Sequence, residues 1–257
     1  MKIALLGHGV FSNYSYRMLQ PVLEDKSFEI VLMIIYQPKE KSIKQKLISS
    51  WKKGRRGYLL IIISEAIIKK IQAKIKKKEV EEKDYYSEKF FSKRQVNIIK
   101  TPKLYTDEII EQVKSYDADA LVLVDFYRIV RDKLIHLFPK GVFSYHYGNM
   151  RNYRGQPPAF WEFYNGEKEM GVTVQQINAG LDCGEPIEEM TIQFDKEKNS
   201  IPSVSKWVDK KCPTMMYKAL KKIQGGYQPE KIEKYGELCT VPTLRQWIWF
   251  HIKQLFR

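Results

Sequence analysis

The sequence contains few of the residues from which disulfide frameworks and structural metal sites are built. Its 257 residues include three cysteines and four histidines, and no two cysteines have the Cys-x-x-Cys spacing. An odd number of isolated cysteines (Cys183, Cys212 and Cys239) argues against a disulfide framework and favours a reducing, cytoplasmic setting. The lack of a Cys/His cluster argues in the same way against a bound metal.

Long apolar runs are also missing. No stretch approaches the roughly 18 consecutive apolar residues that a membrane-spanning helix needs. The N-terminal run ends at Gly7-His8-Gly9, too early for a signal peptide, and we interpret it as a buried strand. Hydrophobic residues nevertheless make up 44% of the chain and aromatic residues 13%. This composition predicts a globular protein of one domain, or of one domain with a small appendage.

Positive charge is concentrated in one segment. The formal net charge is +14, and Lys39–Lys78 holds fourteen Lys and Arg against two acidic residues, a local surplus of +12. From Tyr58 onward this segment has the pattern of a helix with a Leu/Ile stripe and a lysine face. We expect a helical insertion that covers a sheet edge. A helix that contacts an anionic membrane or nucleic acid is the alternative.

The C-terminal segment 243–257 combines aromatic and basic side chains. Trp247, Trp249 and Phe250 accompany Arg245 and Lys253, a composition typical of an interfacial helix. Such a helix either docks on the domain, or on a second copy in a homodimer, or lies on a membrane surface. Together with the basic segment 39–78 it predicts peripheral contact with an anionic membrane at its cytoplasmic face, and no nucleic-acid partner is expected.

Apolar runs and helical patterns alternate along the rest of the chain. We expect strands at Lys2–Leu6, Phe28–Tyr36, Ala118–Val124, Val142–Tyr147, Gly171–Ile177 and Pro186–Phe194, and helices at Ser12–Leu23, Thr106–Ser115 and Ser203–Gln224. This order predicts an α/β fold with a doubly wound, mostly parallel sheet. The main domain would span residues 1–200 with a basic helical insertion at 39–100, and a C-terminal helical extension would span 201–257.

Two residues suited to acid–base chemistry follow the central strands. His146 lies at the end of an expected strand, where ligands bind in open α/β sheets. Asp182 lies between Gly180 and Gly184, so the backbone there can turn tightly beside a ligand. A carboxylate orients an imidazole and favours its charged form. Taken alone, His146 is equally consistent with a structural histidine in the core, and Asp182 with a residue that forms a turn.

Four motifs in a fixed order make the pattern more specific. They are Ser144-Tyr145-His146, Tyr153-Arg154-Gly155, Gly171-Val172-Thr173 and Gly180-Leu181-Asp182-Cys183-Gly184. This set resembles the formyltransferase family that uses 10-formyltetrahydrofolate, which includes methionyl-tRNA formyltransferase, glycinamide ribonucleotide transformylase and the sugar N-formyltransferases. The likeness is loose over Lys2–Tyr36 and close over Asp117–Ile192.

The resemblance implies a formyltransferase-like Rossmann-type fold and formyl transfer to a primary amine without a metal. His146 would be the catalytic imidazole and Asp182 its carboxylate partner. Ser144 occupies the position of the family's Asn, whose amide can donate to the developing oxyanion. The folate would lie along Val124–Ile129 and the turn at 178–184. The residues expected to contact the folate are Phe126, Tyr127, Gly180, Leu181 and Gly184.

The loop after His146 is the expected acceptor site, formed by Asn149, Arg151, Arg154 and Gly155. Arg151 replaces the usual Pro of the family loop, and the two arginines could bind a diphosphate. Asn149 could compensate for Ser144. The alternative from another class is a divergent or inactive relative that serves as an RNA- or membrane-binding module.

The segments that known family members have outside the common domain limit the choice of acceptor substrate. Methionyl-tRNA formyltransferase adds a C-terminal β-barrel that binds tRNA, whereas 75 residues follow Asp182 here. A purine-pathway enzyme would lack the insertion and the aromatic C-terminal segment. We therefore expect a nucleotide- or lipid-linked amino sugar of polysaccharide biosynthesis as the acceptor, with methionyl-tRNA as the second alternative.

Overall fold

A computed structural model describes most of the chain outside the basic segment. The described residues are 1–38, 45, 85–126, 128–155, 157, 159–178, 183–194 and 208–255. The chain divides into two compact units, the first made of Met1–Pro38 and Lys83–Cys239, the second of Lys39–Glu82 and Thr240–Arg257. The sheet and the candidate site lie in the first unit. No helix among the described residues is long and apolar enough to cross a membrane.

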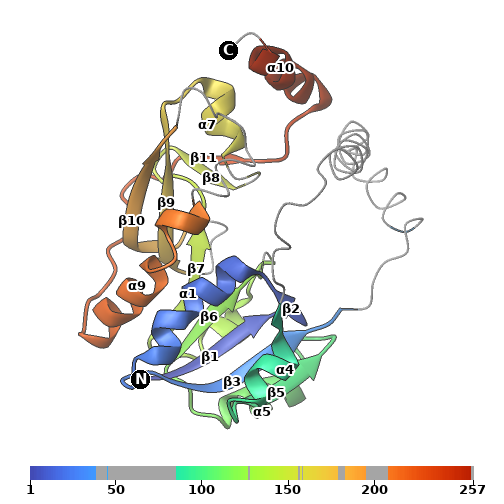
Figure 1. Cartoon of the computed structure of the whole chain (residues 1–257), viewed down its shortest axis with the longest axis vertical. Coiled ribbons are helices and arrows are strands. Elements are labelled where there is room, and N and C mark those ends of the chain that lie inside the picture. The colour runs from blue at the N-terminus through green and yellow to red at the C-terminus, as the bar shows by residue number, and fades with distance from the viewer. Residues whose placement is uncertain are drawn as a thin grey trace. The chain divides into compact units, whose positions relative to one another are not determined.

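A seven-stranded sheet with the order β10-β9-β7-β6-β1-β3-β5 forms the centre of the first unit (Figure 1). Its strands are β1 (Lys2–Gly7), β3 (Glu29–Tyr36), β5 (Asn97–Thr101), β6 (Ala120–Val124), β7 (Gly141–His146), β9 (Glu169–Gln176) and β10 (Glu185–Gln193). The first five are mutually parallel, whereas β9 is antiparallel to both β7 and β10. The expected mostly parallel α/β sheet is confirmed.

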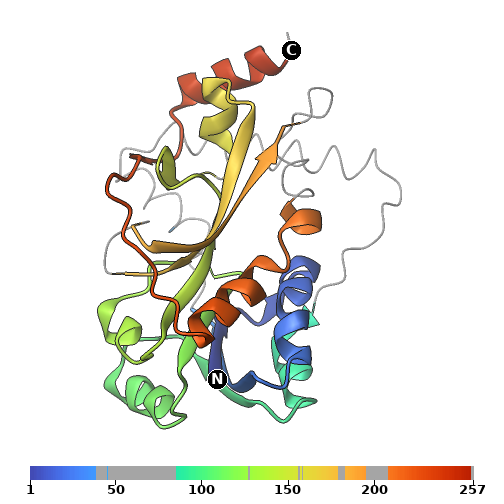
Figure 2. The ribbon, with the colours of Figure 1, turned by 90° about the vertical axis from the view of Figure 1, so that its left-hand side faces the viewer.

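Helices cover both faces of this sheet, which explains why the central strands are apolar on both sides. On one face, α1 (Asn13–Glu24) and α9 (Met215–Gln224) lie side by side (Figures 1 and 2). On the other, α5 (Asp107–Lys114) and α6 (Asp132–Ile135) contribute Val113 and Leu134 to a core that includes Leu6 and Leu121. All five residues of β6 are buried, as in a parallel strand covered on both faces.

Side-chain caps fix where the first helices begin. Ser12 precedes α1, and its Oγ accepts a hydrogen bond from the Ser15 N–H at 3.2 Å. Thr106 caps α5 in the same way through the Ile109 N–H. The Asp125 carboxylate, directly after β6, accepts the Ser12 N–H at 2.8 Å. The start of α1 is thereby held against the carboxyl end of β6.

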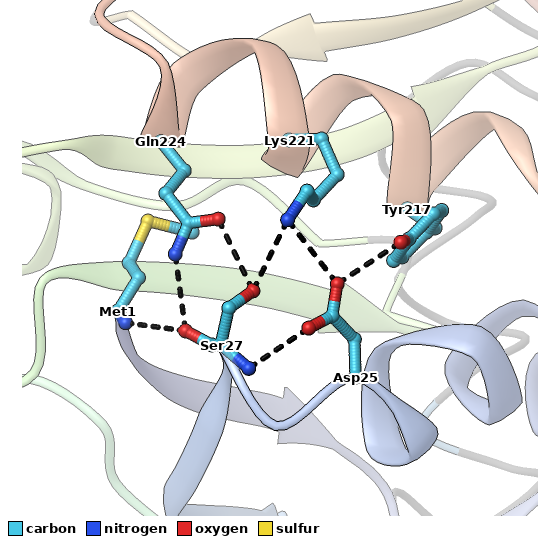
Figure 3. A network of polar contacts seen from close by, with 6 residues as sticks. All are labelled: Met1, Asp25, Ser27, Tyr217, Lys221 and Gln224. Atoms are coloured by element: carbon cyan, nitrogen blue, oxygen red, sulfur yellow. Dashed lines mark hydrogen bonds and ion pairs between the residues drawn. The ribbon is translucent and has the colours of Figure 1, made fainter.

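A polar network attaches α9 to the loop between α1 and β3 (Figure 3). The Asp25 carboxylate accepts the Tyr217 hydroxyl at 2.9 Å and pairs with Lys221 at 3.2 Å. Gln224 donates its amide to the Ser27 carbonyl at 3.0 Å. The Ser27 N–H, together with Tyr217 and Lys221, holds the pKa of Asp25 well below its usual range.

Shorter elements complete the first unit, and one helix lies in the second. In the first unit they are β2 (Val10–Phe11), β4 (Tyr85–Tyr86), α4 (Ser87–Ser92), β8 (Tyr153–Gly155), α7 (Phe160–Asn165) and β11 (Glu237–Cys239). β2 pairs with β4, and β8 pairs in parallel with β11. In the second unit, α10 (Leu244–Leu255) is the helix expected near the C-terminus.

Three expected boundaries are wrong. The insertion does not reach residue 100, because β5 pairs with β3 inside the main sheet and the first unit resumes at Lys83. The helix expected from Ser203 is interrupted, since a turn at Cys212–Thr214 containing Pro213 precedes α9. Residues 208–239 belong to the first unit and not to a separate extension, because α9 packs on the sheet and β11 extends β8. Apart from Gln45, the basic segment 39–78 lies outside the described residues.

Candidate functional site

A small pocket lies where the strand order of the sheet reverses. The chain runs from β1 to β3 and β5 on one side, then to β6 and β7 on the other, so the reversal falls between β1 and β6. In open α/β sheets, ligands bind at the carboxyl ends of the strands at this point. The pocket offers about 40 Å³ into which water molecules fit. Its lining residues are Tyr14, Ser15, Met18, Leu123, Asp125, Phe126, Ser144, Tyr145 and Tyr147.

Three tyrosines make one wall of the pocket flat and uncharged. Tyr14 of α1 meets Tyr145 edge-on, with ring centroids 5.9 Å apart, and Tyr145 stacks on Tyr147 at 6.1 Å. Burial raises the pKa of the Tyr14 and Tyr145 hydroxyls, so both remain protonated at neutral pH. This wall suits an uncharged ring better than an anion, because it supplies π faces and neutral hydroxyls.

Ser144 lies on the pocket wall and is joined to the neighbouring strand. It is 9% exposed, and its Oγ accepts a hydrogen bond from Gln175 Nε2 at 3.3 Å. Ser144 is the direct register partner of Gln175 in the β7–β9 ladder. Gln175 is 5% exposed, and its Oε1 is buried without a hydrogen-bond partner among the described residues. A buried amide with one unused atom at a strand end is expected where a ligand completes the hydrogen bonding.

His146 closes β7 two residues after Ser144 and is also buried, with 6% of its surface exposed. Residues i and i+2 of a strand share one face, so the two side chains lie on the same side of the sheet. His146 Nε2 lies 3.2 Å from the Tyr153 carbonyl of β8. Its register partner Thr173 donates to the Gly148 carbonyl at 3.4 Å, which ties the loop after β7 to β9.

The expected folate-contacting residues are partly described. Phe126 lines the pocket and stacks on His8, with centroids 5.7 Å apart. Gly184 packs against Gln175, since an added Cβ would lie 2.6 Å from Gln175 Oε1. Tyr127, Gly180 and Leu181 of this set lie outside the described part of the chain, as does the expected catalytic residue Asp182. The pairing of His146 with Asp182 therefore stays a prediction.

The expected acceptor-binding residues hold the loop in place. Arg151 forms an ion pair with Glu189 of β10, and Arg154 donates to the Gly236 carbonyl and to Cys183 Sγ. The Asn149 side chain accepts the Arg151 N–H at 3.0 Å. Gly155 has φ +101°, and a Cβ there would lie 2.1 Å from the Cys239 carbonyl, so β11 can approach only a glycine. None of these four residues lines the pocket.

Sequence reasoning missed three polar residues of this region. Tyr14 lines the pocket, Gln175 donates a hydrogen bond to Ser144 on the pocket wall, and Glu162 is an acidic residue that is 3% exposed. Glu162 lies in the aromatic helix α7. The available signal in the sequence was an acidic residue between Trp161 and Phe163, in a segment apolar enough to be buried. Among the described residues, no group of three or more His, Cys, Asp or Glu could hold a metal ion.

Comparisons with known proteins agree with this geometry. Residues 33–220 match the family described as Formyl transferase. Methionyl-tRNA formyltransferase from Trichlorobacter lovleyi is 27% identical over 145 residues, which cover 56% of this chain and 46% of that protein. The chain thus matches about half the length of this curated relative.

Solved structures share the fold at low identity. Glycinamide ribonucleotide transformylase 1 from Symbiobacterium toebii superposes with a TM-score of 0.63 at 12% identity, covering 93% of this chain and 94% of that one. A sugar 3N-formyl transferase, WlaRD, solved in the presence of dTDP and 5-N-formyl-THF, gives 0.55 at 18% identity, covering 90% of this chain and 66% of that one.

Proposed function

The chain belongs to the formyl transferase family, and we propose that it transfers a formyl group from 10-formyltetrahydrofolate to a primary amine of a nucleotide- or lipid-linked amino sugar. The observation that carries this proposal is that two buried polar residues share one face of β7: Ser144, which lines the pocket at the strand-order reversal, and His146, two residues further along the strand.

The chemistry requires a group that handles protons and a group that stabilises negative charge. The amine nitrogen attacks the formyl carbon, and the carbonyl oxygen becomes an oxyanion. The bond between this carbon and the folate nitrogen then breaks, so the amine loses one proton and the folate nitrogen gains one. His146 is the proton carrier, and its charged form also stabilises the oxyanion. Asp182 is its expected carboxylate partner.

The amide beside Ser144 supplies the polar environment that the oxyanion needs. A serine hydroxyl is shorter than an asparagine amide, but Gln175 places an amide next to it from β9. Its buried and unpartnered Oε1 supports a site that is completed by a bound ligand. Phe126 and the tyrosine wall then offer apolar surface to the folate ring.

The amino-sugar acceptor is supported by the fold-level likeness to a sugar 3N-formyl transferase solved with dTDP. Arg151, exposed on the loop after β7, adds a cation beside which a diphosphate could bind once Glu189 is displaced. Methionyl-tRNA is the second candidate acceptor, because the chain shares 27% identity over 145 residues with a methionyl-tRNA formyltransferase.

An acceptor panel distinguishes these substrates. Purified protein with 10-formyltetrahydrofolate is offered nucleotide-linked amino sugars, aminoacylated initiator tRNA or glycinamide ribonucleotide, and tetrahydrofolate release is followed. We expect turnover with an amino sugar and a loss of about 10²-fold or more in His146→Ala. A preference for tRNA or glycinamide ribonucleotide over every amino sugar would contradict the proposed acceptor.

A further inference from the structure

A buried carboxyl group, that of Glu162, lies near His146. Glu162 is 3% exposed, although it is part of α7, whose other buried residues are Phe160 and Phe163. Its Oε1 is buried and has no hydrogen-bond partner among the described residues. Leaving a carboxylate unpartnered in an apolar environment is costly. A protein that retains one at such a position is expected to use it.

Gly148 brings the carboxyl group and the imidazole to the same place. A Cβ added to Gly148 would lie 3.0 Å from His146 Nε2 and 3.4 Å from Glu162 Oε1, so both atoms border one point. The Tyr153 carbonyl borders it as well, at 2.9 Å. Any side chain at position 148 would therefore separate or displace the two groups. An opposite charge within about 4–6 Å favours the ionised form of a titratable group.

The surroundings of Glu162 disfavour its ionised form unless a positively charged group lies nearby. Burial, and to a lesser extent Glu167, raises the pKa of Glu162 to about 7. Within the described part of the chain, the titratable groups that face it are Glu167 after α7, Tyr153 of β8, Cys239 of β11 and His146 of β7. Of these four, only the imidazole can carry a positive charge. Ionisation of Glu162 and protonation of His146 therefore favour each other.

We propose that Glu162 is a positioning residue for formyl transfer, which acts through His146 by stabilising the charged form of its ring. This inference rests on the proposed function. During transfer His146 takes a proton from the amine and passes one to the folate nitrogen. The carboxylate stabilises the ring in the interval when it carries both protons. Glu162 itself forms no bond to either substrate.

The test compares Glu162→Gln with Glu169→Gln, in which the same change is made at an exposed carboxylate of β9. For Glu162→Gln we expect kcat to fall about tenfold or more, while KM for both substrates stays within about twofold. Without the carboxylate the ring loses its proton at lower pH. Because His146 must be neutral to take the amine proton, the acid limb of the kcat–pH profile should move down by about one pH unit. Glu162→Asp should recover part of the activity, and Glu169→Gln should resemble the unmodified protein.

A second readout does not depend on turnover. The ring resonances of His146, assigned through His146→Gln among the four histidines, are followed by NMR against pH. Their midpoint should be lower by about one pH unit in Glu162→Gln than in the unmodified protein. An unchanged midpoint would overturn the role of Glu162, even in a protein that releases tetrahydrofolate normally. If the unmodified protein releases none with any acceptor, the proposed function fails, and the NMR comparison still decides the coupling.

Folding of the Gln variant is checked by its melting temperature. The folded-state pKa of Glu162 lies above its unfolded value, so the stability of the unmodified protein decreases as the pH rises from about 4.3 to about 7. The amide avoids this loss because it does not ionise. We therefore expect Glu162→Gln to melt at the same or a higher temperature than the unmodified protein at pH 8. Lower activity combined with undiminished stability separates a functional role from a structural one.

Discussion

Around the end of β7, most buried polar atoms of the described residues have hydrogen-bond partners, and the few that lack one mark the candidate site. Ser144 and His146 project from the same face of β7, and each is joined to a residue of another strand, Gln175 in β9 and Tyr153 in β8. Among the described residues, three buried side-chain polar atoms have no hydrogen-bond partner: the Tyr14 hydroxyl, Gln175 Oε1 and Glu162 Oε1. Tyr14 lines the pocket, and Gln175 and Glu162 border this cluster. Buried polar groups are normally paired, so these exceptions indicate where a ligand is bound or a charge develops.

Moving the amide group from position 175 in β9 to position 144 in β7 tests whether Gln175 contributes to the rate of formyl transfer. Gln175→Met keeps the volume but removes the donor to Ser144, and we expect tetrahydrofolate release to slow by about tenfold or more. Ser144→Asn in the Gln175→Met background restores an amide from the other strand and should recover most of the rate. The matched control is Gln176→Met, because the adjacent side chain points to the opposite face of β9 and lies against Gly141.

Two outcomes of this exchange would contradict the role assigned to Gln175. In the first, Gln175→Met releases tetrahydrofolate as fast as Gln176→Met. In the second, Ser144→Asn fails to rescue the rate although the double variant melts within a few degrees of the unmodified protein.

Local sequence patterns predicted the residues of β7 but not their partners. Ser144 and His146 were identified because their motif precedes a loop and a second glycine-rich turn in a fixed order. Gln175 was missed because its position depends on the register of β7 against β9, in which it faces Ser144 across 31 residues of chain. Glu162 was missed because its proximity to His146 depends on the path of the loop at Gly148. Such non-local pairings leave no periodic trace in the sequence.

At the scale of elements, the attachment of α9 to β7 holds the pocket wall in place. Tyr145 donates its hydroxyl to the Cys212 carbonyl at 2.7 Å and accepts the Met216 N–H at 3.1 Å. The same ring contacts Tyr14 and Tyr147, which line the pocket. The turn before α9 is therefore coupled to the strand that carries His146.

Tyr145→Phe should destabilise the protein by about 2 kcal/mol, because it leaves a buried N–H and a buried carbonyl without their shared partner. The midpoint of urea denaturation measures this loss. Tyr227→Phe is the control, since that side chain is 43% exposed and its loss should stay within about 0.5 kcal/mol. Equal midpoints for the two variants would show that the hydroxyl of Tyr145 does not hold α9.

The ends of helices could be predicted where a capping side chain or a glycine pair marks them. Strands whose position depends on pairing with a distant strand could not be predicted. Ser12 and Thr106 begin their helices as their capping patterns indicate, and α9 ends before the Gly225-Gly226 pair. The sequence predicts no strand at β5, because five residues with two consecutive isoleucines are too short for a distinctive pattern. Its strand identity comes from pairing with β3 at the sheet edge.

For the molecule as a whole, the sequence predicted the family and the fold, and both are confirmed by the match over residues 33–220 and by the seven-stranded sheet. The acceptor and the expected membrane contact through 39–78 and 243–257 stay predictions. These two properties depend on surfaces outside the sheet, so neither the strand order nor the pocket determines them. The formyl transfer itself is the claim on which the rest of the account depends.

The most direct measurement of that claim follows the formyl carbon. Purified protein is given 10-formyltetrahydrofolate carrying a carbon-13 formyl group together with a nucleotide-linked amino sugar, and the product is analysed by mass spectrometry and NMR. The account predicts a labelled formamide on the sugar, formed in amounts equal to the tetrahydrofolate released and lost in His146→Ala. Release of labelled formate without a labelled amide, or equal labelling by His146→Ala, would contradict it.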